Sequence, residues 1–148
     1  MQALRNASFM NQPTLVSIQT LIVIGPYLSN SGRFLDAWTL FGITIRLAHC
    51  LGLHRDPKFL EIVPSLRECT TRRVLWWSML HTDQQYSATL GKPLGISGIG
   101  DCPPSLPLTT NRQVVRLEEF VNNFTVLARE ILSSDGNEKL RQDRPLHR

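Results

Sequence analysis

The chain has 148 residues and a formal charge of +4, with 42% hydrophobic and 19% charged residues. This composition is typical of a globular protein and argues against wholesale disorder. The length suits one domain or part of one, and a compact fold of this size buries about 70% of the surface of its unfolded chain. The positive charge is spread along the sequence and lacks the dense basic stripe of a nucleic-acid-binding surface.

Three cysteines, Cys50, Cys69 and Cys102, lie far apart in the sequence and form no C-x-x-C pair. An odd number of scattered cysteines does not suit a disulfide framework, so a reducing compartment is expected. Cys50 falls within an apolar helical stretch and is predicted to be a small buried hydrophobic residue.

An apolar run near the N-terminus, Leu15–Leu28, is too short to cross a bilayer, which takes about 20 residues. It also lacks the basic flank and the cleavage site of a signal peptide. No membrane role is predicted.

Two helices are expected in the first third of the chain. Pro13 and Thr14 open the first, which is apolar on all faces, as in a buried helix, and stops at the break 29–32. Asp36 is the predicted N-cap of the second, and Gly42 within it suggests close packing of another helix. The second helix ends at a glycine, and its core stripe comprises Ala37, Leu40, Phe41, Thr44, Leu47, Ala48 and Leu51.

Two further helices are expected after a connection that contains two prolines. Ser65 and Glu68 fit a capping box, so a third helix is predicted from there to about Leu90. Glycines and prolines make 94–107 a loop. A final helix is predicted from about Thr110 to Leu132, and its core spacing comprises Val114, Leu117, Val121, Phe124, Leu127 and Ala128.

These elements predict an all-α fold, an irregular bundle or array of about four helices with long loops and no evident sheet. The expected organisation is a flexible N-terminus at 1–12, a helical domain at 13–132 and a disordered tail at 133–148, which is polar and without periodicity.

Two stretches carry unusual chemistry. In Leu51–Pro57, Gly52 closes a helix and is followed by Leu53, His54, Arg55 and Asp56 before the proline. In the second stretch, Arg72 and Arg73 stand near the start of a helix, just ahead of Trp76 and Trp77.

The arginine pair opposes the helix dipole at a cost of about 0.3–1 kcal/mol for each charge, which favours specific acidic partners such as Glu68 or Asp83. A solvated helix start and a contact to phosphates are the alternatives. The two tryptophans point about 100° apart, and the expectation is that they belong to the core.

No catalytic, cofactor-binding or metal-binding residue is predicted. His49 and His54 are five positions apart with a helix stop between them, whereas a chelating pair on one helical face needs a spacing of four. His81 and Asp83 point to different sides of a helix. The sequence contains neither G-x-S-x-G nor G-x-x-x-x-G-K-[ST], so an enzyme is not expected.

A set of short motifs in one order nevertheless resembles a known family, the fungal-specific transcription factor domain, or middle homology region, of fungal zinc-cluster transcription factors. The resemblance covers residues 15–107. It comprises Gln19–Leu21, Ala37–Trp38 through Gly42, Arg46–Ala48, Leu51–Asp56, Arg72–Arg73, Trp76–Ser78, Asp83 and Gly91–Pro93.

The resemblance implies a helical regulatory domain of a nuclear transcription factor, without chemistry of its own. It implies partners in other regions of the parent factor or in another protein, and possible small-molecule effectors between the helices. In the family, zinc and DNA are bound by an N-terminal six-cysteine cluster, which is absent here. The motif residues would be structural: Gly52, Leu53, His54, Arg55, Asp56, Arg72, Arg73, Trp76, Trp77, Asp83, Gly91 and Pro93.

The chain departs from the family pattern, which often has an acidic residue just before the arginine pair, where Thr70 and Thr71 stand here. Its three scattered cysteines cannot form the zinc cluster, and the family's regulatory region runs well beyond 148 residues. The expectation is therefore a fragment of a factor that lacks the cluster. An effector-binding helical module and a truncated, non-functional paralogue are the alternative interpretations.

Overall fold

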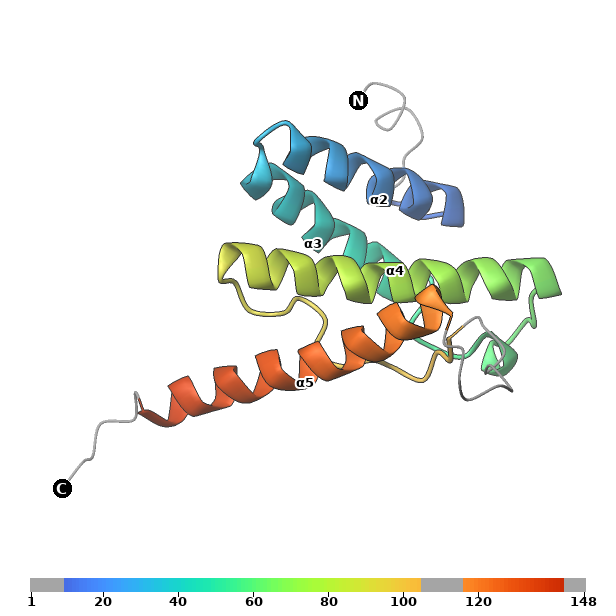
Figure 1. Cartoon of the computed structure of the whole chain (residues 1–148). Helices are drawn as coiled ribbons and strands as arrows, with labels where there is room; N and C mark the ends of the chain where they lie inside the picture. The colour runs from blue at the N-terminus through green and yellow to red at the C-terminus, as the bar shows by residue number, and fades with distance from the viewer. Residues whose placement is uncertain (1–9, 105–115, 143–148) are drawn as a thin grey trace. The chain divides into compact units, whose positions relative to one another are not determined.

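The computed structural model describes residues 10–104 and 116–142, with side chains described as far as Ser133. This part of the chain contains no strand, which confirms the predicted all-α class. Figure 1 shows its helices, which are α2 (Leu15–Asn30), α3 (Phe34–Cys50), the 3-10 helix η1 (Pro57–Phe59), α4 (Leu66–Leu90) and α5 (Leu117–Gln142).

The described residues divide into two compact units. The first contains residues 10–79 and 98–104, and the second contains residues 80–97 and 116–142. The first half of α4 belongs to the first unit and its second half to the second. Each unit has its own set of buried side chains.

In the first unit, α2 and α3 lie side by side as an antiparallel pair (Figure 1). Thr14 caps α2, since its hydroxyl oxygen accepts a hydrogen bond from the Ser17 N–H at 3.1 Å. Ile18 and Leu21 are buried, whereas Val23 is 72% exposed. The prediction of a helix buried on all faces is therefore wrong, because packing against α3 covers only one side of α2.

Helix α3 begins at Phe34, and its N-cap is Arg33. Asp36 lies in the first turn and pairs with Arg33 at 2.6 Å, so its prediction as the N-cap is wrong. The predicted core stripe largely holds, since most of its members are buried. The buried residues of α3 are Ala37, Phe41, Thr44, Ile45, Leu47 and Ala48.

Two smaller predictions for α3 are wrong. Cys50 is exposed, because two positions turn it about 200° around the helix from the buried Ala48. Gly42 does not mark a close approach of another helix, since a Cβ built there would meet no atom within 4 Å.

Glycine ends α3 in the predicted way. The N–H of Gly52 donates to the His49 carbonyl at 3.0 Å, and the N–H of Leu53 donates to the Ala48 carbonyl at 3.0 Å. These two bonds form a Schellman motif, which requires a left-handed residue, and Gly52 has φ = +67°. The side chain of Leu53 is fully buried, so the turn is anchored in the core of the first unit.

The predicted limits of α4 are confirmed. Ser65 accepts a hydrogen bond from the Glu68 N–H at 3.3 Å, which is one half of the capping box. Gly91, with φ = +61°, follows the last residue of the helix. The buried apolar side chains of α4 are Cys69, Leu75, Trp76, Met79, Leu80 and Tyr86.

Helix α5 differs from its prediction in length and in orientation. It continues to Gln142, so the first part of the predicted disordered tail is helical, consistent with the good helix formers at 138–142. Residues 105–115, where the predicted helix began, and residues 1–9 and 143–148 lie outside the described residues. Leu117, Phe124 and Leu127 were assigned to the core but are exposed, whereas Thr125 and Arg129 are buried.

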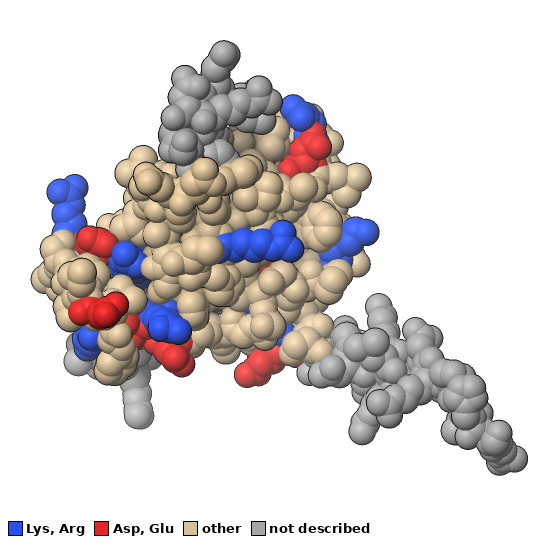
Figure 2. Space-filling view, turned by 180° about the vertical axis from the view of Figure 1, so that it is seen from behind, with Lys and Arg blue, Asp and Glu red and all other residues tan. Residues whose placement is uncertain are grey.

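The described surface shows no concentration of positive charge on the face seen in Figure 2. Lysine and arginine side chains are interspersed there with acidic and uncharged residues, and acidic side chains lie among the basic ones at the lower left of the view. None of the helices in the described residues has the length and apolarity needed to cross a membrane.

The Schellman turn yields a matched pair of glycine variants. Gly52→Ala should destabilise the protein by about 1–2 kcal/mol, because alanine is strained at positive φ. Gly42→Ala should stabilise it by about 0.5–1 kcal/mol, because that helical position has open space. Urea unfolding of both variants checks this, and a shift of both in the same direction would contradict the assignment of the α3 end.

Candidate functional site

The first half of α4 holds the turn that follows α3. Arg72 donates from a terminal guanidinium nitrogen to the Leu51 carbonyl at 2.9 Å and from Nε to Glu68 at 2.9 Å. Arg73 pairs with Asp56 at 3.5 Å. Both arginines therefore have an acidic neighbour, and Asp83, the other partner considered from the sequence, belongs to a separate cluster.

Asp56 links Arg73 to η1, because its carboxylate pairs with Arg73 and also accepts a hydrogen bond from the Lys58 N–H at 3.2 Å. Cys102 lies in the same surroundings. Burial raises the pKa of its thiol to about 11, an effect that Asp56 reinforces and the nearby Arg73 opposes. The thiol is thus protonated at neutral pH, which makes it a poor nucleophile.

The two tryptophans bind a loop segment, residues 98–104 of the same unit. Trp76 is fully buried, and its indole N–H donates to the Ile99 carbonyl at 2.6 Å. Trp77 is half-buried and donates to the Cys102 carbonyl at 3.2 Å. Because a buried indole N–H needs an acceptor, each ring fixes the backbone of this segment as well as filling space.

The same segment contacts the turn after α3. The Asp101 N–H donates to the His54 carbonyl at 2.9 Å. At Gly100, with φ = +76°, a Cβ would overlap that carbonyl oxygen, so only glycine allows the approach. Sequence reasoning treated 94–107 as a plain loop, and Gly100 was the available signal for this contact.

In the second unit, Asp83 organises a buried polar cluster. Its carboxylate accepts hydrogen bonds from the N–H groups of Gly95 and Ile96 at 2.9 and 3.0 Å and pairs with Arg129 at 3.1 Å. Arg129 also donates to the carbonyls of Leu80 and Ile96. The cluster ties α5 and the loop 94–97 to the second half of α4.

The sequence reasoning did not identify Arg129. The available signal was a single arginine on the helical face that also carries Val121, Ala128 and Leu132. Of the remaining motif residues, Gly91 adopts positive φ at the end of α4, and Pro93 is exposed.

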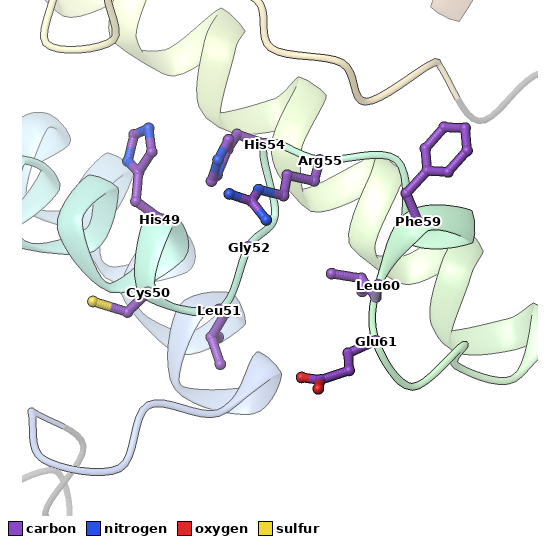
Figure 3. Close-up of a pocket in the computed structure, with 9 residues that line it drawn as sticks. All are labelled: His49, Cys50, Leu51, Gly52, His54, Arg55, Phe59, Leu60 and Glu61. Carbon is purple, nitrogen blue, oxygen red and sulfur yellow. The ribbon is translucent and has the colours of Figure 1, made fainter.

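A pocket of about 370 Å³ opens at the C-terminal end of α3 (Figure 3). The turn after Gly52 brings the ring of His54 to a centroid distance of 5.0 Å from that of His49, although the sequence spacing had given no reason to expect a contact. His49 and His54 lie 5.5 and 6.1 Å from the Trp76 ring. The pocket is lined by His49, Cys50, Leu51, Gly52, His54, Arg55, Phe59, Leu60 and Glu61.

The arrangement defines a helical domain whose motif side chains hold backbone groups in place. The described residues contain no cluster of three or more potential metal ligands.

The family model of the fungal specific transcription factor domain matches residues 2–130. The chain is 34% identical over 96 residues to an uncharacterised transcriptional regulatory protein of Schizosaccharomyces pombe. These residues cover 65% of this chain and 12% of that protein. It is 29% identical over 82 residues to cutinase transcription factor 1 beta of Fusarium vanettenii, covering 55% of this chain and 9% of the relative.

A C6 finger domain transcription factor of Aspergillus fumigatus is 30% identical over 79 residues, which cover 51% of this chain and 10% of that protein. No solved structure matches the chain. The chain belongs to the fungal specific transcription factor domain family. Its relatives associate the domain with regulation of transcription, and the chain spans about a tenth of their length.

Gly100 provides a test of the contact between the turn and the loop. Gly100→Ala should destabilise the first unit by about 1–3 kcal/mol, because it combines a strained backbone with a clash against the His54 carbonyl. Gly98→Ala is the matched control, since a Cβ at that position meets nothing within 4 Å. Equal unfolding midpoints for the two variants in urea would contradict the contact.

Arg129 provides a test of the buried cluster. Arg129→Leu should cost about 3–5 kcal/mol, because it leaves the Asp83 carboxylate buried without its cation. Arg116→Leu removes the same charge from an exposed position and should change stability by less than about 0.5 kcal/mol. Chemical denaturation compares them, and a similar effect of both would show that the ion pair is unimportant.

Proposed function

We propose that this domain is a non-catalytic regulatory module of a nuclear, DNA-binding transcription factor. The observation that carries the proposal is the family match over residues 2–130, together with relatives that are transcription factors in their own right. The module would act by packing against other regions of its factor or against a protein partner.

The local chemistry supports a role without catalysis. Arg72, Trp76 and Trp77 donate to backbone carbonyls, and Asp83 accepts from backbone N–H groups, so these polar atoms are engaged in holding loops. A catalytic group needs to reach a substrate, and these groups are instead bonded within the fold. The raised pKa of Cys102 likewise disfavours a thiol nucleophile.

The proposal includes contact with DNA through a different part of the factor. The chain has three scattered cysteines, whereas one relative is named for a C6 finger domain. We infer that zinc and DNA are bound by such a cluster outside these residues, and that this domain modulates the outcome of that binding.

A reporter assay in yeast tests the proposal. The full chain is inserted between a heterologous DNA-binding domain and an activation domain, and the output is compared with that of the same fusion without the chain. A regulatory module that packs against its neighbours should lower the output several-fold. Arg129→Leu should relieve this effect by destabilising the second unit, and Arg116→Leu should not.

Protein levels and nuclear fluorescence of the fusions provide the controls. Equal reporter output with and without the chain, at equal protein levels, would contradict a restraining role. Exclusion of the chain, expressed alone with a fluorescent tag, from the nucleus would contradict the nuclear assignment.

A further inference from the structure

The pocket at the C-terminal end of α3 is open to solvent, has the size of a small-molecule site and has a lining that is more polar than apolar. It holds about 370 Å³, which is within the lower range of ligand pockets. Leu51 and Leu60 give it apolar walls. Figure 3 shows the side chain of Leu60 pointing into the pocket and the ring of Phe59 pointing away from it.

Arg55 supplies a positive charge without a carboxylate partner. Its side chain lies beside His54 at the edge of the pocket (Figure 3), and within residues 10–104 and 116–133 no ion pair to it is found. Arginines elsewhere in the chain, such as Arg72 and Arg129, do pair with carboxylates. The Arg55 guanidinium thus has its donors available for a bidentate bond to an anion.

The C-terminal end of a helix normally repels anions, because its last carbonyl groups carry partial negative charge. Here that charge is offset. The carbonyls of Ala48 and His49 accept the N–H groups of the Schellman turn, and the Leu51 carbonyl accepts a hydrogen bond from Arg72. Arg72 therefore adds positive charge at the end of the helix from which the pocket is built.

His54 also lines the pocket, and its Nδ1 is buried without a hydrogen-bond partner among the described residues. Glu61 is the acidic residue of the pocket lining and repels any anion, so it disfavours a dianion more than a monoanion whose charge is bound by Arg55.

We propose that this pocket binds a small organic monoanion, a carboxylate with a short apolar group. Arg55 binds the carboxylate, His54 lies beside it, and Leu51 and Leu60 contact the apolar portion. The proposal does not depend on the regulatory role, because ligand binding is measured on the isolated chain and reporter output on fusions.

Titration of the full ¹⁵N-labelled chain with hexanoate and, separately, with hexanamide tests the proposal. The two probes have the same length and differ in charge. Hexanoate should cause saturable shifts of the Gly52, Arg55 and Leu60 amide signals, and hexanamide should bind at least about tenfold more weakly. Equal binding of the two probes, or shifts that do not saturate, would overturn the proposal.

A pair of arginine variants locates the site. Arg55→Gln should weaken hexanoate binding by about tenfold or more. Arg46→Gln removes the same charge from an exposed position of α3 outside the pocket and should leave the affinity unchanged. If both variants bind as the unmodified chain does, or lose affinity equally, Arg55 is not the anion-binding group. The hexanoate and hexanamide comparison needs no variant and stands even if one fails to fold.

The pH dependence of binding provides an independent measurement. Burial lowers the pKa of His54, and so do His49 and Arg55, whereas Asp101 raises it. A bound carboxylate favours the protonated ring, and Glu61 is the other carboxylate of the pocket lining. Binding should therefore take up a proton, and hexanoate affinity should rise as the pH falls below 6.5, the ordinary histidine pKa from which that of His54 is lowered. A flat or opposite profile would remove His54 from the site.

Discussion

The buried indole N–H of Trp76 is the constraint on which the first unit depends. The ring is fully buried on α4, so its single donor needs an acceptor within the fold, and that acceptor is the Ile99 carbonyl. A chain segment without helical structure must therefore pass within hydrogen-bond distance of α4. Once it does, Gly100 becomes necessary for the approach to His54, and the turn after α3 is bonded to the same segment.

The motif residues of the family thus act mainly on backbone groups. Arg72 reaches the end of α3, Trp76 and Trp77 reach the segment 98–104, and in the second unit Asp83 reaches the loop 94–97. Because the side chains of α4 fix these loops, a few motif residues determine the backbone path of the surface loops around the helix. The proposed function would use this surface for contact with other regions of the factor or with a partner, and the proposed pocket beside His54 would allow a small anion to bind there.

Local signals in the sequence were sufficient for some features that local physics controls, although they misplaced the N-cap of α3 at Asp36. The Ser65–Glu68 cap and the glycine stop after α3 were predicted because each depends on a few adjacent residues. Features that depend on distant residues were missed. Helix α5 turns Arg129 toward Asp83 and leaves Phe124 and Leu127 exposed, a pairing that no local pattern indicates. The contact between His49 and His54 depends on the path of the turn between them, which sequence spacing does not describe.

The most direct test of this account is amide hydrogen exchange at Asp101 in Trp76→Phe. Phenylalanine keeps most of the buried ring and removes the donor, so the Ile99 carbonyl loses its partner. If the indole N–H positions the segment, the Asp101 N–H, which donates to His54, should exchange several-fold faster while amides within α2 and α3 keep their protection. Unchanged exchange at Asp101 in the folded variant would show that the segment is held without Trp76, which contradicts the central claim.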